Sequence, residues 1–320
     1  MEKKASTKKK IPWGKIVKIA GGVLMVISIV FVIRYFIQME VDWSELLQPT
    51  ILVSIIIGGI ISSASVALLS YPWKSILEML SGTKLPFKQV FVIYCRANLS
   101  KYVPGNFMHY AMRNILGKEY EISQSHMAVS SIMEIIILIL AGLVLIVALT
   151  WNGLTIAMRA AISDGMIKAE WLYIIIAVLI AAIIMVLLYI KRKGYFSSFS
   201  IKKTLLSFAY YAAALFINSV IFFLVAMAIN AQAALEYPFL ICGYYLAAWL
   251  IGFVTPGAPG GLGIREYIML LLLVSFFTSS DLALIVVVSR IANVIGDILA
   301  FMYTYLAKPA GGRHKKEETI

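Results

Sequence analysis

The sequence predicts an all-α polytopic membrane protein with about six full spans and two broken, re-entrant-like helical hairpins arranged as an inverted repeat. Of its 320 residues, 61% are hydrophobic and only 14% are charged, and the mean hydropathy is +0.90. Such a composition lies outside the range found in soluble proteins. Several apolar runs approach the roughly 20 residues that a helix needs to cross the bilayer. Proline and glycine interrupt two other apolar regions, which predicts the broken hairpins.

Hydropathy divides the chain into three parts, a basic cytoplasmic N-terminus at 1–15, one transmembrane domain at 16–307 and a basic cytoplasmic tail at 308–320. The first apolar run lacks a small-residue cleavage site, which favours an uncleaved span over a signal peptide. Full spans are expected at 16–38, 49–71, 122–150, 171–190, 204–229 and 281–307.

Two further apolar regions, 86–117 and 238–278, are each broken near the middle. Each therefore divides into two helices of about 12 to 16 residues, which is below spanning length. Length favours helices that turn back within the membrane, although charge also allows two oblique crossings. The helix breakers are Pro104 and Gly105 in the first region and Pro256, Gly257 and Pro259 in the second.

The two broken regions align with each other at a constant offset of 152 residues, which places Arg113 on Arg265. The same offset places Pro104 and Gly105 on Pro256 and Gly257, and these are costly residues within a membrane. The repeat halves are then about 16–150 and 171–307. Three crossings separate equivalent points, so the halves are expected to be inverted, as in many secondary transporters.

Basic residues set the expected orientation. If each broken region contributes an even number of crossings, the lysine-rich N-terminus, the cluster at 191–203 and the GGRHKK tail all fall on the cytoplasmic side. The acidic loop that holds Glu40, Asp42 and Glu45 then falls outside. One crossing per broken region would place the cluster at 191–203 outside, so the even count is favoured.

The second break, TPGAPGGLGIRE, has the outline of an anion site. Glycines there allow backbone N–H groups to approach a ligand, and a helix expected to start near Gly263 carries Arg265 in its first turn. Glu266 could hold this guanidinium, favour the helix N-terminus or carry a proton. The alternative is a tight turn with Arg265 snorkelling to the interface. The candidate phosphate ligands here are Gly260, Gly261, Gly263 and Arg265.

The first break, KYVPGNF, supplies the matching half of this expected site. Asn106 is a candidate helix N-cap, Lys101 precedes the break, and His109 and Arg113 follow it. We expect Lys101, Asn106 and Arg113 to contact a lipid phosphate. The alternative is a basic patch at the membrane interface in which His109 is simply solvated.

Polar residues within the spans complete the candidate site. Arg290, Asn293 and Asp297 lie at i, i+3 and i+7 of the last span, which is one helical face, and Glu134 lies in the third span. Such charges are costly in a membrane without partners, which favours a hydrated cavity over purely structural ion pairs, although both readings stay open. Glu134, Glu266 or Asp297 would neutralise an aminoacyl ammonium or relay protons.

Several function classes are excluded by what the sequence lacks. Cys95 and Cys242 lie in apolar stretches without a CxxC or histidine neighbour, so no metal site or disulfide framework is expected. No P-loop, GxSxG motif or hydrolytic triad occurs, and no cofactor is expected. The net charge of +12 gathers beside apolar runs, which indicates orientation signals and anionic-lipid contacts rather than nucleic-acid binding.

The VPGN segment followed by an arginine, and the later PG…GGLGIRE before an apolar run, resemble the lysylphosphatidylglycerol synthase transmembrane family, also called the uncharacterised 0104 family. The resemblance covers about 15–307. It includes the flippase-like membrane domain of the multiple peptide resistance factors, without their cytoplasmic aminoacyltransferase domain. It implies a protein of a bacterial or archaeal plasma membrane that acts on an anionic, aminoacylated or polyprenyl-phosphate lipid.

The sequence is therefore consistent with three functions. The favoured one is an integral membrane lipid translocator whose partners are membrane phospholipids. The second is enzymatic, either a membrane-embedded transferase or the membrane component of a phosphatidylglycerol lysyltransferase that works with a separately encoded aminoacyltransferase, because no lysyl transfer is expected from this chain itself. The third is a non-transporting scaffold for a separately encoded glycosyltransferase or for a complex of the cell envelope.

Overall fold

The computed structural model describes residues 44–102, 107–118, 120, 122–163, 192–194, 198–255, 261 and 263–306, with side chains left aside at 152–163. These ranges are helical and contain no strand. Several predictions fall outside them: the two terminal segments 1–15 and 308–320, the spans at 16–38 and 171–190, and the residues Pro104, Gly105, Asn106, Pro256, Gly257, Pro259 and Gly260.

Four described helices are long and apolar enough to cross a membrane. They are α2 (Pro49–Ser81), α5 (Gln124–Ser163), α7 (Ile201–Ile229) and α11 (Ser279–Leu306). Each covers one of the spans expected from hydropathy. The protein is therefore a helical, membrane-embedded protein.

Shorter helices occupy the two broken regions. The first contains α3 (Phe87–Asn98), the 3-10 helix η2 (Leu99–Tyr102) and α4 (Met108–Lys118). The second contains α9 (Pro238–Val254) and α10 (Ile264–Leu273). All four α-helices, at 12, 11, 17 and 10 residues, are shorter than the roughly 20 that a straight span requires. A single turn, η1 (Glu45–Leu47), precedes α2, and α8 (Ala231–Glu236) joins α7 to α9.

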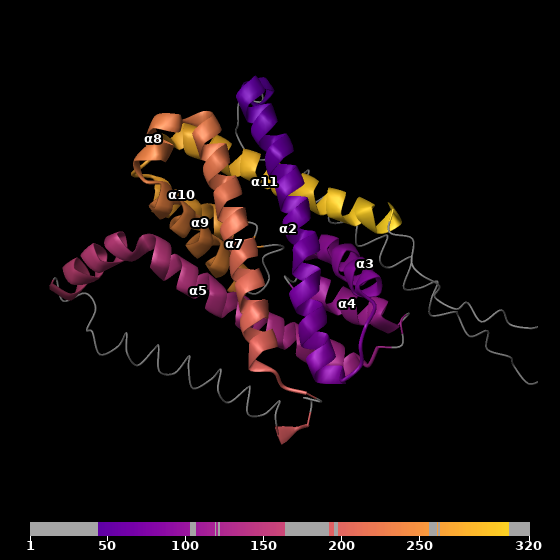
Figure 1. Cartoon of the computed structure of the whole chain (residues 1–320). Coiled ribbons are helices and arrows are strands. Elements are labelled where there is room, and N and C mark those ends of the chain that lie inside the picture. Colours follow the sequence, from indigo (N-terminus) through magenta and orange to yellow (C-terminus); the bar gives the residue numbers. More distant parts are fainter. Residues whose placement is uncertain are drawn as a thin grey trace, which may run out of the picture.

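The long helices run in opposite directions two by two, and α2 and α7 are in direct contact (Figure 1). Helices α2 and α7 lie side by side and run in opposite directions, and α5 and α11 cross them obliquely, also in opposite directions. Helices α3 and α4 lie on one flank of this arrangement, and α9 and α10 lie on the other.

Helices α2 and α11 form the most extensive contact in the described part of the chain. Small residues allow it: a methyl group added at Gly296 would lie 2.5 Å from Ser62 Cβ and 2.9 Å from the Gly59 carbonyl oxygen. Backbones that approach this closely are typical of helix pairs in membranes. This contact makes α11 a central helix, with 61% of its most apolar stretch buried inside the molecule.

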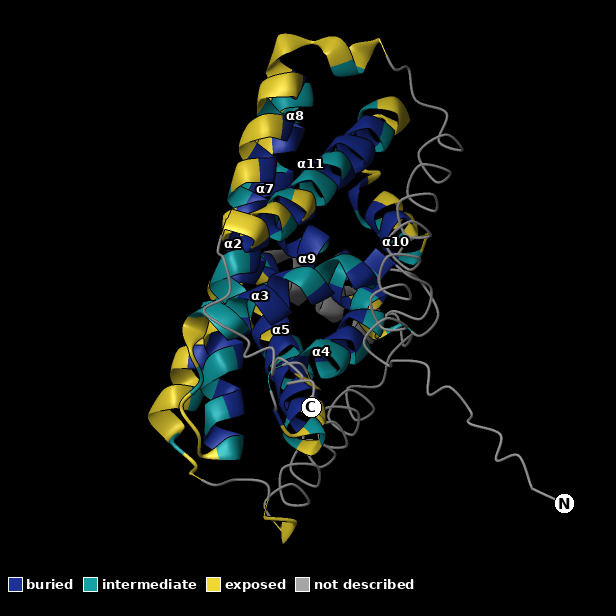
Figure 2. Cartoon of the chain, turned by 90° about the vertical axis from the view of Figure 1, so that its right-hand side faces the viewer, coloured by how far each residue is buried: buried dark blue, intermediate teal, exposed yellow. Residues whose placement is uncertain are grey.

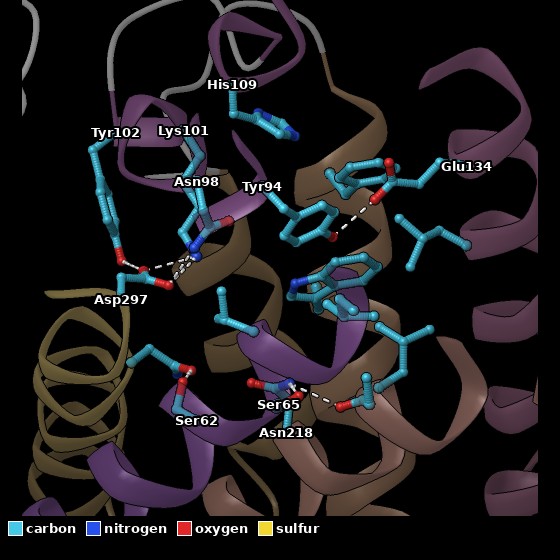
Figure 3. A pocket seen from close by; sticks show the side chains of 18 of the residues that line it. Ser62, Ser65, Tyr94, Asn98, Lys101, Tyr102, His109, Glu134, Asn218 and Asp297 are labelled. Atoms are coloured by element: carbon cyan, nitrogen blue, oxygen red, sulfur yellow. Dashed lines mark hydrogen bonds and ion pairs between the residues drawn. The ribbon is translucent and has the colours of Figure 1, made fainter. Parts of the chain in front are cut away.

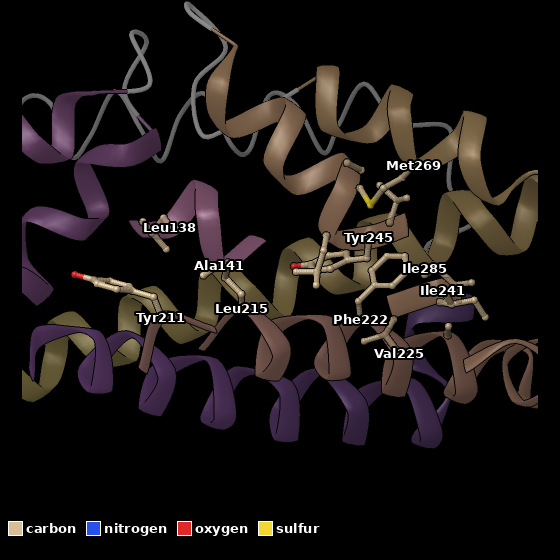
Figure 4. Packing of buried hydrophobic residues seen from close by; sticks show 14 of the residues in the cluster. Leu138, Ala141, Tyr211, Leu215, Phe222, Val225, Ile241, Tyr245, Met269 and Ile285 are labelled. Carbon is tan, nitrogen blue, oxygen red and sulfur yellow. The ribbon is translucent and has the colours of Figure 1, made fainter. Parts of the chain in front are cut away.

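A continuous apolar core joins α5, α7, α9, α10 and α11 (Figure 4). Phe222 of α7 stacks on Tyr245 of α9, with ring centroids 4.6 Å apart, and Met269 of α10 is buried beside them. The outer faces of the long helices are exposed and apolar (Figure 2), as at Ile56 and Ile60 of α2. A surface of this kind suits contact with lipid chains.

Hydrogen bonds fix the ends of the long helices relative to one another. The Ser198 N–H donates to the Met79 carbonyl oxygen at 3.1 Å, which holds the segment before α7 against the end of α2. At the other end of α7, the Asn230 amide donates to Asp281 Oδ2 of α11 at 3.0 Å. The end of α2 and the start of α7 therefore lie at the same end of the molecule.

Candidate anion-binding cavity

A cavity of about 160 Å³ lies where the two broken regions meet the long helices. Because one water needs roughly 10–15 Å³ measured in this way, the space can hold a group of phosphate size together with several waters. Its walls come from both broken regions and from all four long helices. Figure 3 shows the side of the cavity that carries its acidic and tyrosine side chains.

Arg113 of α4 is held in an aromatic cage. Its guanidinium lies 3.9 Å from the ring centroid of Tyr94 and 5.0 Å from that of Trp73, and it pairs with Glu134 of α5. Only 1% of Arg113 is exposed. Glu134 also accepts a 2.9 Å hydrogen bond from the Tyr94 hydroxyl. The Arg113 charge is therefore matched by a buried carboxylate.

Asp297 of α11 is the centre of a second cluster (Figure 3). Its carboxylate pairs with Lys101 at 2.7 Å, accepts a 2.7 Å hydrogen bond from the Asn98 amide, and accepts another from the Tyr102 hydroxyl. All three donors come from the first broken region. The cluster thus ties α3 and η2 to the last long helix, with Asp297 1% exposed.

Glu266 joins α10 to α11. Its Oε2 accepts a 2.6 Å hydrogen bond from the Gly263 N–H, which caps the start of α10, and its Oε1 pairs with Arg290. Gly263 has φ 85°, a left-handed conformation that favours glycine. Of the roles considered from the sequence, Glu266 therefore has the capping role, and the guanidinium it holds is that of Arg290 rather than Arg265.

Arg265 is buried among the described residues without an ion-paired carboxylate. It is 6% exposed, its guanidinium lies 4.6 Å from the Tyr245 ring centroid, and its Nε has no hydrogen-bond partner. Gly252 and Gly261 make room for it, since a methyl group added at Gly252 would lie 3.0 Å from Arg265 Cβ. Close approach of α9 to the start of α10 thus places an uncompensated guanidinium in the cavity wall.

Two further cavity-lining nitrogens lack a hydrogen-bond partner among the described residues, the Nε of Arg113 and the Nδ1 of His109. His109 lies on α4. The side chain lines the cavity and is 8% exposed, and its Nδ1 has no hydrogen-bond partner in the described part of the chain. Its ring packs on Tyr110 at a centroid distance of 3.9 Å. His109 is therefore buried, whereas one interpretation of the sequence placed it in solvent. Buried polar atoms are rarely left without partners, so both Nδ1 and the Arg265 Nε mark positions where a ligand atom fits.

The charges around the cavity do not cancel. Four cations, Lys101, Arg113, Arg265 and Arg290, face three carboxylates, those of Glu134, Glu266 and Asp297. Each carboxylate is paired with one cation, which leaves Arg265. The described wall therefore carries one positive charge in excess, and an anion is the species that balances it.

The rest of the wall is largely apolar. Leu246, Trp249 and Phe253 of α9 line it together with Leu138 of α5 and Leu215 of α7. Two polar contacts interrupt this surface, the Asn218 amide donating to Ser65 at 3.3 Å and the Ser62 hydroxyl donating to Asn293 at 3.3 Å. A wall with a cationic side and an apolar side suits an amphiphile.

Most sequence-predicted site residues that the structure describes come together here. Glu266 lies behind the wall, and Gly261 and Gly263 shape the approach of α10, with φ 76° and 85°. Those lining the cavity are Lys101, Arg113, Glu134, Arg265, Arg290, Asn293 and Asp297. Sequence reasoning missed Tyr94, Tyr102, Asn218 and Tyr245. Polar aromatic residues at internal helix positions were the signal that could have found three of them.

Fold and site together define a helical membrane protein with a buried, net cationic cavity between two broken helical regions. In comparisons with protein-family models, curated proteins and solved structures, the chain has no match.

Proposed function

We propose that the protein is a lipid translocator that receives the phosphate of a membrane lipid in the cavity while the acyl chains stay in the apolar surroundings. The observation that carries this proposal is the buried Arg265, whose charge has no ion-paired carboxylate among the described residues, whereas three neighbouring cations each have one. A fixed, uncompensated charge at this depth is costly and is typical of a substrate site.

An inverted repeat supports this function, because transporters with that architecture bind substrate where their broken helices meet. The described helices are spaced as the offset of 152 requires: α2, α3, α4 and α5 correspond in order to α7, α9, α10 and α11. The opposite directions of α2 and α7, and of α5 and α11, agree with inversion (Figure 1). We propose six full spans, with both termini in the cytoplasm, around these two hairpins.

The resemblance to the lysylphosphatidylglycerol synthase transmembrane family supports a phospholipid as the substrate of a bacterial or archaeal plasma-membrane protein. The apolar cavity wall on α9 favours a molecule with hydrocarbon chains over a small soluble anion. Lipid translocation accounts for the cavity, whereas a scaffold needs no buried excess charge.

Reconstitution tests the proposal. Purified protein in liposomes should move a fluorescent phosphatidylglycerol between leaflets, measured as the fraction protected from an external quencher, and protein-free liposomes should not. Replacing Arg265 with alanine should slow this movement at least about ten-fold, because the phosphate loses its counter-charge. Arg96→Ala is the matched control, since Arg96 bonds to Thr304 outside the cavity. Movement that persists in Arg265→Ala at the wild-type rate would rule out this site.

A further inference from the structure

We infer that the cavity selects lipids whose headgroup is a phosphodiester of single net negative charge, and that it discriminates against headgroups that also carry an ammonium. This inference rests on the proposed function and narrows its substrate class. Three features of the cavity wall carry it: the size of the charge excess, the engagement of each described carboxylate, and two nitrogens from different broken regions, Arg265 Nε and His109 Nδ1, that lack a hydrogen-bond partner among the described residues.

The excess charge sets the charge of the ligand. Arg265 contributes one positive charge that the described carboxylates leave unmatched. A phosphodiester monoanion cancels this charge in a poorly solvated space, where an uncompensated charge costs several kcal/mol. A phosphomonoester dianion or a diphosphate would instead leave negative charge in excess.

The carboxylates are already occupied. Glu134 receives Arg113 and the Tyr94 hydroxyl, and Asp297 receives Lys101, Tyr102 and Asn98. Glu266 receives Arg290 and the Gly263 N–H. A headgroup ammonium would enter a net cationic wall in which no described carboxylate is free to receive it. This geometry argues against the role of ammonium partner that the sequence suggested for Glu134, Glu266 and Asp297.

Two of the unsatisfied nitrogens, one from each broken region, match the hydrogen-bonding capacity of a phosphodiester. Arg265 Nε–H is a donor, and His109 Nδ1 is a donor in the tautomer that carries its proton there. They lie on α10 and α4, one in each broken region. A phosphodiester has two non-bridging oxygens, so one phosphate can accept from both helices and bridge the halves of the site.

Lipid selectivity tests the inference in liposomes. Labelled phosphatidylglycerol should move at least about ten-fold faster than labelled phosphatidylethanolamine or lysyl-phosphatidylglycerol at equal mole fraction. Equal rates for the three lipids, all lowered by Arg265→Ala, would overturn the selectivity and leave the translocator intact. A faster rate for the lysylated lipid would overturn it as well.

A single substitution should shift this preference. Lys101→Gln removes the cation that pairs with Asp297, while the Asn98 amide still donates to Oδ1 and the Tyr102 hydroxyl still donates to Oδ2. The described wall then has no positive excess and one carboxylate without a cationic partner. We expect the phosphatidylglycerol rate to fall and the phosphatidylethanolamine rate to rise. Lys74→Gln is the matched control, because Lys74 pairs with Glu78 outside the cavity. An unchanged preference in Lys101→Gln would contradict the charge argument.

Binding measurements distinguish a failure of lipid selectivity from a failure of lipid translocation. In detergent, phosphatidylglycerol should raise the melting temperature of the wild type but not of Arg265→Gln, and phosphatidylethanolamine should raise neither. This pattern without any lipid movement would refute translocation and retain the selectivity. Stabilisation by the soluble phosphodiester glycerophosphoglycerol equal to that by the lipid would identify a soluble phosphate ester as the ligand and overturn the lipid assignment.

Discussion

Arg113 and Arg265 occupy matching positions in the two broken regions, but their surroundings differ and indicate different roles. Arg113 pairs with Glu134 and is enclosed by aromatic rings, whereas Arg265 has one aromatic neighbour and no carboxylate partner in the described part of the chain. A buried ion pair whose members depend on each other is structural. An unmatched buried guanidinium is available for a ligand.

Substitution of each arginine should therefore affect stability and lipid movement differently. Arg113→Gln leaves Glu134 buried without its counter-charge and should destabilise the protein by about 3–5 kcal/mol, measured by unfolding in a denaturing detergent. Arg265→Gln removes an uncompensated charge and should leave stability unchanged or raised. The double variant Arg113→Gln, Glu134→Gln should recover much of the loss. Equal destabilisation by Arg113→Gln and Arg265→Gln would contradict this assignment.

The residues of the site could be named from the sequence, but not their pairing. Charged residues in apolar runs are conspicuous, and Arg290, Asn293 and Asp297 share a face of α11 because of their spacing. Asp297 nevertheless pairs with Lys101, and Arg290 with Glu266. Such pairs join helices far apart in the chain, and the way those helices pack decides them. Spacing within one helix carries no information about that packing.

At the scale of elements, burial extends helices beyond the limits that hydropathy sets. The span expected at 49–71 continues as α2 to Ser81, through the polar residues Lys74 and Glu78. Trp73, Ile76, Leu77 and Leu80 are buried on the same helix and stabilise this extension. A hydropathy window averages over all faces and ends where charge appears. Tertiary packing rewards only the buried face, so the sequence predicts that the helix exists better than it predicts where the helix ends.

The contact between α2 and α11 should tolerate no added volume. Gly296→Ala places a methyl group against Ser62 and the Gly59 backbone and should cost about 1–3 kcal/mol through overpacking. Gly142→Ala on α5 is the control, because its nearest neighbour would lie at 3.6 Å, an ordinary contact distance. There the gain in helix propensity should leave stability equal or slightly higher. Detergent unfolding of both variants checks this, and equal stability of the two would refute the tight contact.

At the scale of the whole molecule, the proposed inversion brings two chemically unequal halves to one cavity. The first broken region contributes Lys101, His109 and Arg113, and the second contributes Arg265. Offset and helix order could be read from the sequence, because helix breakers and charges are conspicuous in apolar surroundings. The sequence also shows that the halves diverge, since Glu134 and Arg290 have no counterpart at the offset of 152. It does not show which cation each carboxylate pairs with, because helix packing decides this. Under the proposed function, the lipid phosphate lies nearer the second half, because Arg265 is the cavity arginine without an ion-paired carboxylate among the described residues.

The orientation of the long helices is testable by labelling. With α2 about 50 Å long at 1.5 Å per residue, exposed residues before and after it should lie on opposite sides of the membrane. In a background without Cys95 and Cys242, Glu45→Cys should react with an impermeant thiol reagent from outside the cell. Lys84→Cys and Lys203→Cys should react only after the membrane is opened. Reaction of Glu45→Cys and Lys84→Cys from the same side would contradict the topology.

The position of the lipid phosphate is the most direct test of the whole account. A cryo-electron microscopy map of the protein in phosphatidylglycerol nanodiscs, with a bound antibody fragment to aid alignment, should show phosphate density in the cavity. We expect this density within hydrogen-bonding distance of Arg265, facing His109, and we expect it to be lost in Arg265→Gln. Ordered lipid found only on the outer faces of α2, α5, α7 and α11, with Arg265 bound to a carboxylate instead, would contradict the central claim.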